Sequence, residues 1–169
     1  MSSILFKRSA AKNQHGISLI EVLVTLVIVA GGLLGTAGLM IYSMKLNKSG
    51  EFRTQAVLAA SDLFERMEAN KVAAVNGSYI VASNTSTVTT AATNCSNAAC
   101  NAASLANYDL NQWGTTVVST LPQASWSVTS PAAGSPRAYT VVINWTDRSS
   151  NKTASGENFA YTANKSINN

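Results

Sequence analysis

The stretch Gln14-His15-Gly16-Ile17-Ser18-Leu19-Ile20-Glu21-Val22-Leu23-Val24 decides how this chain is organised. A single carboxylate, Glu21, lies five residues after Gly16 at the head of a long apolar run. An ionised side chain at the centre of a bilayer costs about 2.5–3.5 kcal/mol on insertion scales, and less toward the edge. A segment that only anchors the chain has no use for such an acid, whereas a segment that must later pair with a positive group does.

The apolar run is long enough to span a membrane. No charged side chain occurs over residues 22–44, and a helix of about 20 apolar residues crosses a bilayer. The basic residues Lys7, Arg8 and Lys12 lie on its N-terminal side. The positive-inside rule therefore predicts that this flank stays in the cytoplasm and that the chain after Lys45 is exported.

The basic leader, the glycine and the acid together resemble the class III signal of type IV prepilins. In that family a short basic leader is cut after glycine, and the acid at the fifth mature position steers assembly. The resemblance implies cleavage by the prepilin peptidase between Gly16 and Ile17, N-methylation of Ile17, and subunit assembly through Glu21. The family usually has phenylalanine or methionine where this chain has Ile17.

Weaker matches extend the resemblance to one branch of the family, the minor pilins called PilV or type IV pilus modification protein. They are Gly31-Gly32-Leu33-Leu34-Gly35, residues 62–70, Cys95, Cys100, Asp109, Trp113 and Leu121-Pro122. The branch implies a minor pilin in a pilus tip or priming complex that promotes pilus assembly for twitching motility, adhesion or DNA uptake. Its implied partners are the peptidase, other minor pilins, the major pilin, the inner-membrane assembly platform and membrane lipid.

The same resemblance implies a location. The protein is expected in the inner membrane of a Gram-negative bacterium, as a single-pass protein with its head in the periplasm, and afterwards in the pilus at the cell surface. Two alternatives keep a membrane anchor: a minor pseudopilin of a type II secretion system, and a periplasmic adhesin or receptor outside any filament. Two others concern the apolar run itself. One is a plain signal anchor. The other is a secretory signal peptide cut after Gly35-Thr36-Ala37, against which Glu21 counts because it places a charge in the apolar core of such a signal.

We expect an α+β, pilin-like fold, with a long N-terminal helix, half of it transmembrane, packed on a small antiparallel β-sheet head. The expected divisions are a leader over 1–16, a transmembrane or filament-core segment over 17–44, and a periplasmic head over 45–169. One helix is predicted from Ile17 to Asn70, ended by Asn76-Gly77. Its second half is amphipathic. The apolar positions there are Phe52, Val57, Ala60, Leu63, Phe64 and Met67.

The rest of the head is predicted from alternation and turn residues. A short strand is expected over 79–81, a solvated loop over 84–93, and a second helix over 105–121 closed by Pro122. Strands follow over 126–128, 139–146 and 159–161, with turns over 131–136 and 147–151. An antiparallel meander with its aromatic face on the helix would bury both apolar surfaces.

Four glycines, Gly31, Gly32, Gly35 and Gly38, fall inside the predicted apolar helix. Each weakens a helix by up to about 1 kcal/mol relative to alanine. Close packing against another transmembrane helix is one explanation. A local bend or melted stretch on moving from membrane to filament is the other.

The only two cysteines, Cys95 and Cys100, are expected to form a disulfide, which is the default for an exported domain. A zinc site has little support, because the only histidine, His15, lies in the leader. A redox pair would have closer spacing and a basic setting.

Composition argues against catalysis and against direct nucleic-acid binding. The net charge of +4 includes three leader cations, so the mature chain has nine basic and eight acidic residues. Phosphate binding needs clustered cations. Without a mature histidine there is no Ser–His or Cys–His pair, and Asp109, Asp147 and Glu157 are interpreted as ordinary loop or surface carboxylates. Asp109 and Trp113 are interpreted as a helix cap and a core aromatic. We expect no enzyme, metal or cofactor.

Overall fold

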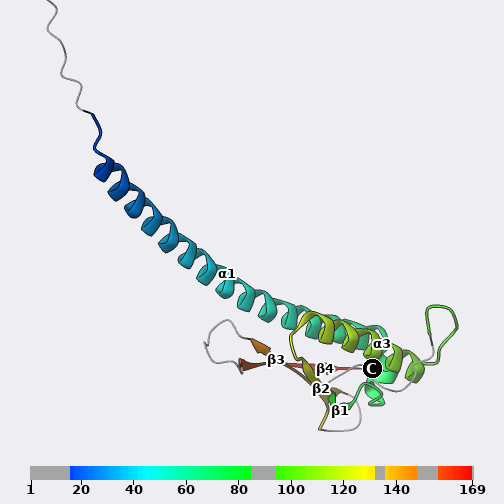
Figure 1. The fold of residues 1–169 in the computed structure, drawn as a ribbon. Coiled ribbons are helices and arrows are strands. Elements are labelled where there is room, and N and C mark those ends of the chain that lie inside the picture. Colours follow the sequence, from blue (N-terminus) through cyan, green and yellow to red (C-terminus); the bar gives the residue numbers. More distant parts are fainter. Residues whose placement is uncertain (1–15, 85–93, 132–135, 148–155, 169) are drawn as a thin grey trace, which may run out of the picture. The chain divides into compact units, whose positions relative to one another are not determined.

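A computed structural model describes residues 16–84, 94–131, 136–147 and 156–168 (Figure 1). Contacts divide the chain into two units, Met1–Tyr42 and Ser43–Asn169. The elements are α1 (Leu19–Ala69), α2 (Lys71–Val75), β1 (Val81–Asn84), α3 (Ala102–Thr120), β2 (Ser125–Thr129), β3 (Arg137–Asp147) and β4 (Glu157–Ile167). The predicted α+β, pilin-like fold is confirmed.

The predicted long helix is confirmed as α1, which begins at Leu19, two residues later than expected, and continues without a break through all four glycines. From Ala56 onward one stripe of α1 is buried in the core of the second unit. The stripe differs from the prediction at one position. Ala56 is fully buried, whereas Val57 is 37% exposed.

Helix α1 ends one residue before Asn70, which was predicted to lie inside it. Asn70 leaves the helical region, with φ −119° and ψ 57°, and its side-chain amide donates a 2.8 Å hydrogen bond to the carbonyl of Ala102. The short helix α2 follows, and the chain then turns at Gly77, where φ is +83°. Gly77 also lies against Arg137, because a Cβ there would be 2.8 Å from Nη1 of that arginine.

The sheet is an antiparallel meander in the order β1-β2-β3-β4, as predicted. β3 and β4 pair residue for residue from Arg137↔Ile167 to Asp147↔Glu157 without a bulge. Burial alternates along β3, and the helices cover the buried face. Most of the predicted loop and both predicted turns fall on 85–93, 132–135 and 148–155, outside the described residues.

One predicted element was placed wrongly, and the predicted second helix is confirmed with an earlier start. The first strand is Val81–Asn84, not 79–81, and Tyr79 is instead a fully buried core residue. The second helix begins at Ala102, three residues earlier than expected, and includes Gly114. Gly114 is tolerated because the Trp126 ring occupies the space beside it. A Cβ at Gly114 would lie 2.7 Å from Cζ2 of that ring.

Helix α3 and the second half of α1 run beside each other over one face of the sheet (Figure 1). Trp113 of α3 contacts both α1 and β2. Its indole Nε1 donates a 2.7 Å hydrogen bond to the carbonyl of Ala59 in α1, and its ring meets the edge of Trp126 in β2, with centroids 5.0 Å apart. Trp113 is therefore a core aromatic, as predicted.

Candidate functional site: the N-terminal motif and the head that follows it

The predicted processing residues lie immediately before α1. Gly16, Ile17 and Ser18 are not helical, and the carbonyl of Ser18 accepts the first backbone hydrogen bonds, from Glu21 at 3.0 Å and Val22 at 3.3 Å. Ile17 is 76% exposed, and a Cβ added at Gly16 would meet no atom within 4 Å. The bond between Gly16 and Ile17 therefore lies in exposed chain before the helix begins.

Glu21 lies in the first turn of α1. A carboxylate in this turn interacts favourably with the partial positive charge of a helix N-terminus. Ser18 and Glu21 also have the spacing of a capping box, in which a serine precedes a helix and a glutamate follows three residues later. Sequence reasoning missed this spacing, but among the described residues neither side chain makes a capping hydrogen bond, and the contacts at the helix start are backbone bonds to the Ser18 carbonyl.

The apolar part of α1 meets the requirement for a membrane span by length and composition. Its large side chains are exposed, from Ile17 to Leu46. A Cβ at Gly31, Gly32, Gly35 or Gly38 would meet no atom within 4 Å. The described residues of this chain therefore do not fill the space beside these glycines, and that space is open to lipid or to another helix.

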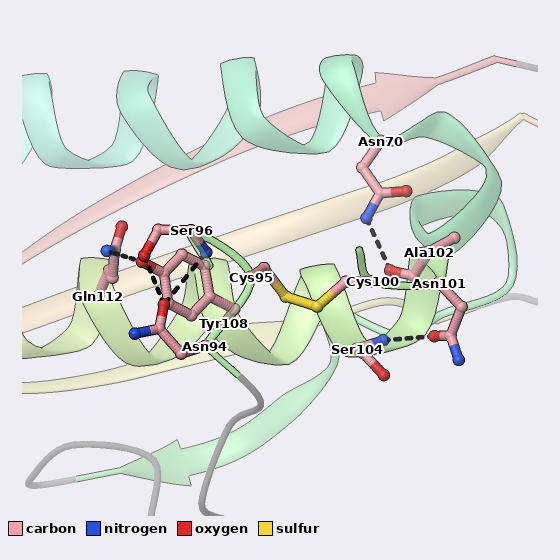
Figure 2. The surroundings of a disulfide bond; sticks show 10 residues. All are labelled: Asn70, Asn94, Cys95, Ser96, Cys100, Asn101, Ala102, Ser104, Tyr108 and Gln112. Carbon is pink, nitrogen blue, oxygen red and sulfur yellow. Dashed lines mark hydrogen bonds between the residues drawn. A yellow bond between two sulfur atoms is a disulfide. The ribbon is translucent and has the colours of Figure 1, made fainter. Parts of the chain in front are cut away.

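The predicted disulfide is confirmed: Cys95 and Cys100 are bonded, with their Cα atoms 5.6 Å apart (Figure 2). The bond closes a small loop directly before α3. Asn101, the next residue, caps α3 because its Oδ1 accepts a 2.8 Å hydrogen bond from the backbone N–H of Ser104. Together with the bond from Asn70 to Ala102, these contacts fix the start of α3 against the end of α1.

Asp109 is not a helix cap, contrary to the prediction. It lies in the middle of α3, where Oδ2 accepts a 2.6 Å hydrogen bond from the hydroxyl of Tyr79 and Oδ1 lies 3.4 Å from Nη1 of Arg66. Burial, together with the hydrogen bond to the Asp109 carboxylate, raises the pKa of Tyr79 well above its ordinary value. Arg66 also pairs with Asp62 at 3.1 Å. This network connects α1, α3 and the turn after α2.

Of the other two carboxylates considered at first, Asp147 differs from the prediction, because it is buried, only 4% exposed, at the end of β3. Glu157, the first residue of β4, is exposed, as predicted for a surface carboxylate. Over the residues that the structure describes, no three His, Cys, Asp or Glu side chains are grouped so that they could hold a metal ion.

An exposed apolar N-terminal helix that leads into an α+β head, with a glycine and an acid five residues apart at its start, defines the class of membrane-anchored pilin-like proteins. Residues 11–37 match the prokaryotic N-terminal methylation motif, and residues 38–111 match the family described as Type IV pilin Tt1218. These matches identify the chain as a type IV pilin, which is a structural and non-enzymatic class of protein. The motif implies processing by a prepilin peptidase and assembly with other pilins.

The matches do not select the PilV branch. No curated protein and no solved structure matches the chain.

Proposed function

We propose that this protein is a minor pilin that enters the tip or priming complex of a type IV pilus and promotes filament assembly. The observation that carries the proposal is the position of Glu21, in the first turn of an apolar helix and five residues after an accessible Gly16–Ile17 bond. The proposed parts are a leader over 1–16, a membrane and filament-core segment over 17–44, and a periplasmic head over 45–169.

Processing creates the charge that assembly uses. Hydrolysis of the Gly16–Ile17 bond leaves a carboxylate on the leader and an amino group on Ile17. A methyl donor then transfers one methyl group to that nitrogen, which loses one proton in exchange. The amine is protonated at neutral pH, so each mature subunit begins with a positive charge four residues before its own Glu21.

Glu21 then acts between subunits. In a bundle of apolar helices an unpaired carboxylate is strongly disfavoured, and pairing with a neighbour's terminal ammonium removes most of that cost. Such a pair forms at one axial offset between two helices. It therefore fixes the register of the incoming subunit as well as attracting it.

The proposal is tested with two variants. Glu21→Ala should be cleaved normally and remain in the membrane, and it should be lost from sheared surface filaments, as detected by mass spectrometry of head peptides. Glu21→Asp, which keeps the charge on a shorter side chain, should restore part of the incorporation. Normal incorporation of Glu21→Ala would contradict the pairing mechanism.

Two measurements separate the proposal from its alternatives. N-terminal sequencing of the membrane-extracted protein should begin at Ile17, and a retained leader or a start near Gly38 would contradict the pilin assignment. Deletion of the gene should reduce surface piliation. Intact pili with lost secretion of exoproteins would instead identify a minor pseudopilin of a type II secretion system.

A further inference from the structure

The sheet has a hollow of about 320 Å³ at the end where β3 and β4 meet Gln123, and its lining includes Trp145 and Phe159 as well as polar residues that point away from the helices. Its polar lining comes from alternate positions of three strands and from the turn before β2. These residues are Gln123, Ser125, Asn144, Thr146 and Asn158, with Phe159 beside them. Among the residues described, none that lines this hollow is charged.

A second hollow of about 330 Å³ shares Gln123 and Thr146 with the first. Phe52 and Pro122 give it an apolar wall, and Asp147 contributes its one charged lining residue among those described. The two hollows therefore adjoin each other, with Gln123 and Thr146 common to both.

Gln123 occupies a conformation that favours glycine. Its φ is 51°, and it is the one non-glycine residue with positive φ among the described residues. It follows Pro122 in the connection from α3 to β2, and proline followed by a residue with positive φ is the pattern of a type II turn, where glycine or asparagine is preferred. A glutamine at this position is strained by its Cβ.

The surrounding structure holds Gln123 in this conformation. Leu121 and Ala124, on either side, are buried at 2% and 4% exposure. The carbonyl of Pro122 accepts a 3.0 Å hydrogen bond from the backbone N–H of Thr146. The side chain of Gln123 is exposed and makes no hydrogen bond to any described residue. A strained residue whose side chain contributes nothing to the fold is a reason to look for a ligand.

We propose that the two hollows form one binding site for a neutral oligosaccharide. Amide groups offer an acceptor oxygen beside two N–H donors, which matches the neighbouring hydroxyl groups of a sugar. Three amides, those of Gln123, Asn144 and Asn158, lie at this site. Among the described lining residues of both hollows the one charged side chain is Asp147, and its carboxylate repels an anionic glycan and so favours a neutral one.

The side-chain amides of Asn144 and Asn158 each already make one hydrogen bond within the protein, and these bonds fix their orientation. Oδ1 of Asn158 accepts a 2.9 Å hydrogen bond from Thr146, and Nδ2 of Asn144 donates a 3.3 Å hydrogen bond to Ser125. Asn158 thus keeps its two N–H donors for a ligand, and Asn144 keeps its carbonyl oxygen. Each hollow lies at the small end of the size range of ligand pockets, so one sugar unit per hollow is the expected occupancy.

The chain contains a matched control for this site. Thr140 and Asn164 form a second cross-strand pair on the same face of β3 and β4, with a 2.7 Å hydrogen bond of the same kind as that between Thr146 and Asn158. Neither Thr140 nor Asn164 lines either hollow. Asn158→Ala and Asn164→Ala should therefore cost similar stability and differ in binding.

The test uses the full mature chain in a detergent without a sugar head group, because an alkyl maltoside would itself present a neutral disaccharide. The protein is applied to an array of tethered neutral glycans, including chitotriose, maltotriose and lactose-terminated chains, with sialylated glycans for comparison. The strongest neutral glycan is then titrated in free form. If the protein binds only the tethered sugar, the ligand is a glycan on a surface. If it also binds the free sugar, soluble oligosaccharides are ligands as well.

We expect binding of a neutral glycan that Asn158→Ala weakens by roughly tenfold, as for loss of one or two hydrogen bonds, and that Asn164→Ala leaves unchanged. Gln123→Gly relieves the strain, so it should unfold at the same or a higher temperature and still bind more weakly. Failure of the wild-type chain to bind any neutral glycan would overturn the proposal. Equal binding by wild type, Asn158→Ala and Gln123→Gly would overturn it as well.

Discussion

The hydroxyl of Tyr79 donates a 2.6 Å hydrogen bond to the carboxylate of Asp109, although the two residues are 30 positions apart in the sequence. Tyr79 has no exposed surface, and its partner lies on α3. The bond fixes the turn after α2 to the middle of α3. Arg66 of α1 lies 3.4 Å from the other oxygen of the same carboxylate. One acid therefore joins three segments of the head.

Tyr79→Phe should lower the free energy of unfolding by about 1–2 kcal/mol, because it removes the donor and leaves a partly buried carboxylate with one partner fewer. The measurement is chemical denaturation of the detergent-solubilised chain. Tyr108→Phe is the matched control, since Tyr108 bonds Gln112 on the exposed side of α3, and surface changes of this kind stay within about 0.5 kcal/mol. Equal effects of the two variants would mean that the Asp109 bond adds nothing.

The raised pKa of Tyr79 predicts a loss of stability at alkaline pH. The ordinary pKa of tyrosine is about 10, and burial followed by the Asp109 hydrogen bond raises it in the folded state. Its contribution is fully present below the unfolded pKa. It is lost as the pH rises from there toward the folded pKa, because only the unfolded chain then ionises at this residue.

The check is the free energy of unfolding as a function of pH in wild type and Tyr79→Phe. Burial also raises the pKa of Tyr139, so some alkaline destabilisation should persist in the variant. The wild-type curve should fall more steeply above pH ~10. Parallel curves would contradict this assignment.

The spacing of apolar residues predicted the helices and strands that bury one face. Alternation over 139–146 predicted β3 and its buried side, and the helical spacing over 52–67 predicted the packed half of α1. Local patterns of this kind reflect burial directly, so they can be read without knowing what covers the face. The end of α1 could not be predicted in this way. It depends on the bond from Asn70 to Ala102, 32 residues later.

The wrong predictions in the head have the same cause, which is contact between residues that are distant in the sequence. Asp109 was expected at a helix end, where an isolated acid is most useful, but its partners Tyr79 and Arg66 are distant in sequence. Helix propensity alone also disfavours Gly114 inside α3, and packing against Trp126 overrides that preference. The sequence motif at Gly16–Glu21, by contrast, is contiguous, and it needed no knowledge of the head.

Gly114→Ala should destabilise the head although alanine is the better helix former. The new Cβ would lie 2.7 Å from the Trp126 ring, and the overpacking should cost about 1–3 kcal/mol. Gly50→Ala is the control, because Gly50 is also helical and a Cβ there meets nothing within 4 Å. It should be stabilising by up to about 1 kcal/mol. Thermal unfolding of both variants checks the contrast, and two stabilised proteins would show that the ring can move aside.

Loss of the Cys95–Cys100 disulfide should loosen the start of α3 while the sheet stays folded. The bond closes a loop of sequence separation 5, so the chain-entropy model gives only about 2 kcal/mol. The double variant Cys95→Ser/Cys100→Ser should exchange amide hydrogens faster over 94–104 than wild type does, with protection of β3 unchanged. Asn101→Ala, which removes the cap of α3 and keeps the disulfide, should cost about 1 kcal/mol and affect the same segment. Equal loss of protection in β3 and in this segment would mean that the loop supports the whole head, contrary to its position outside the core.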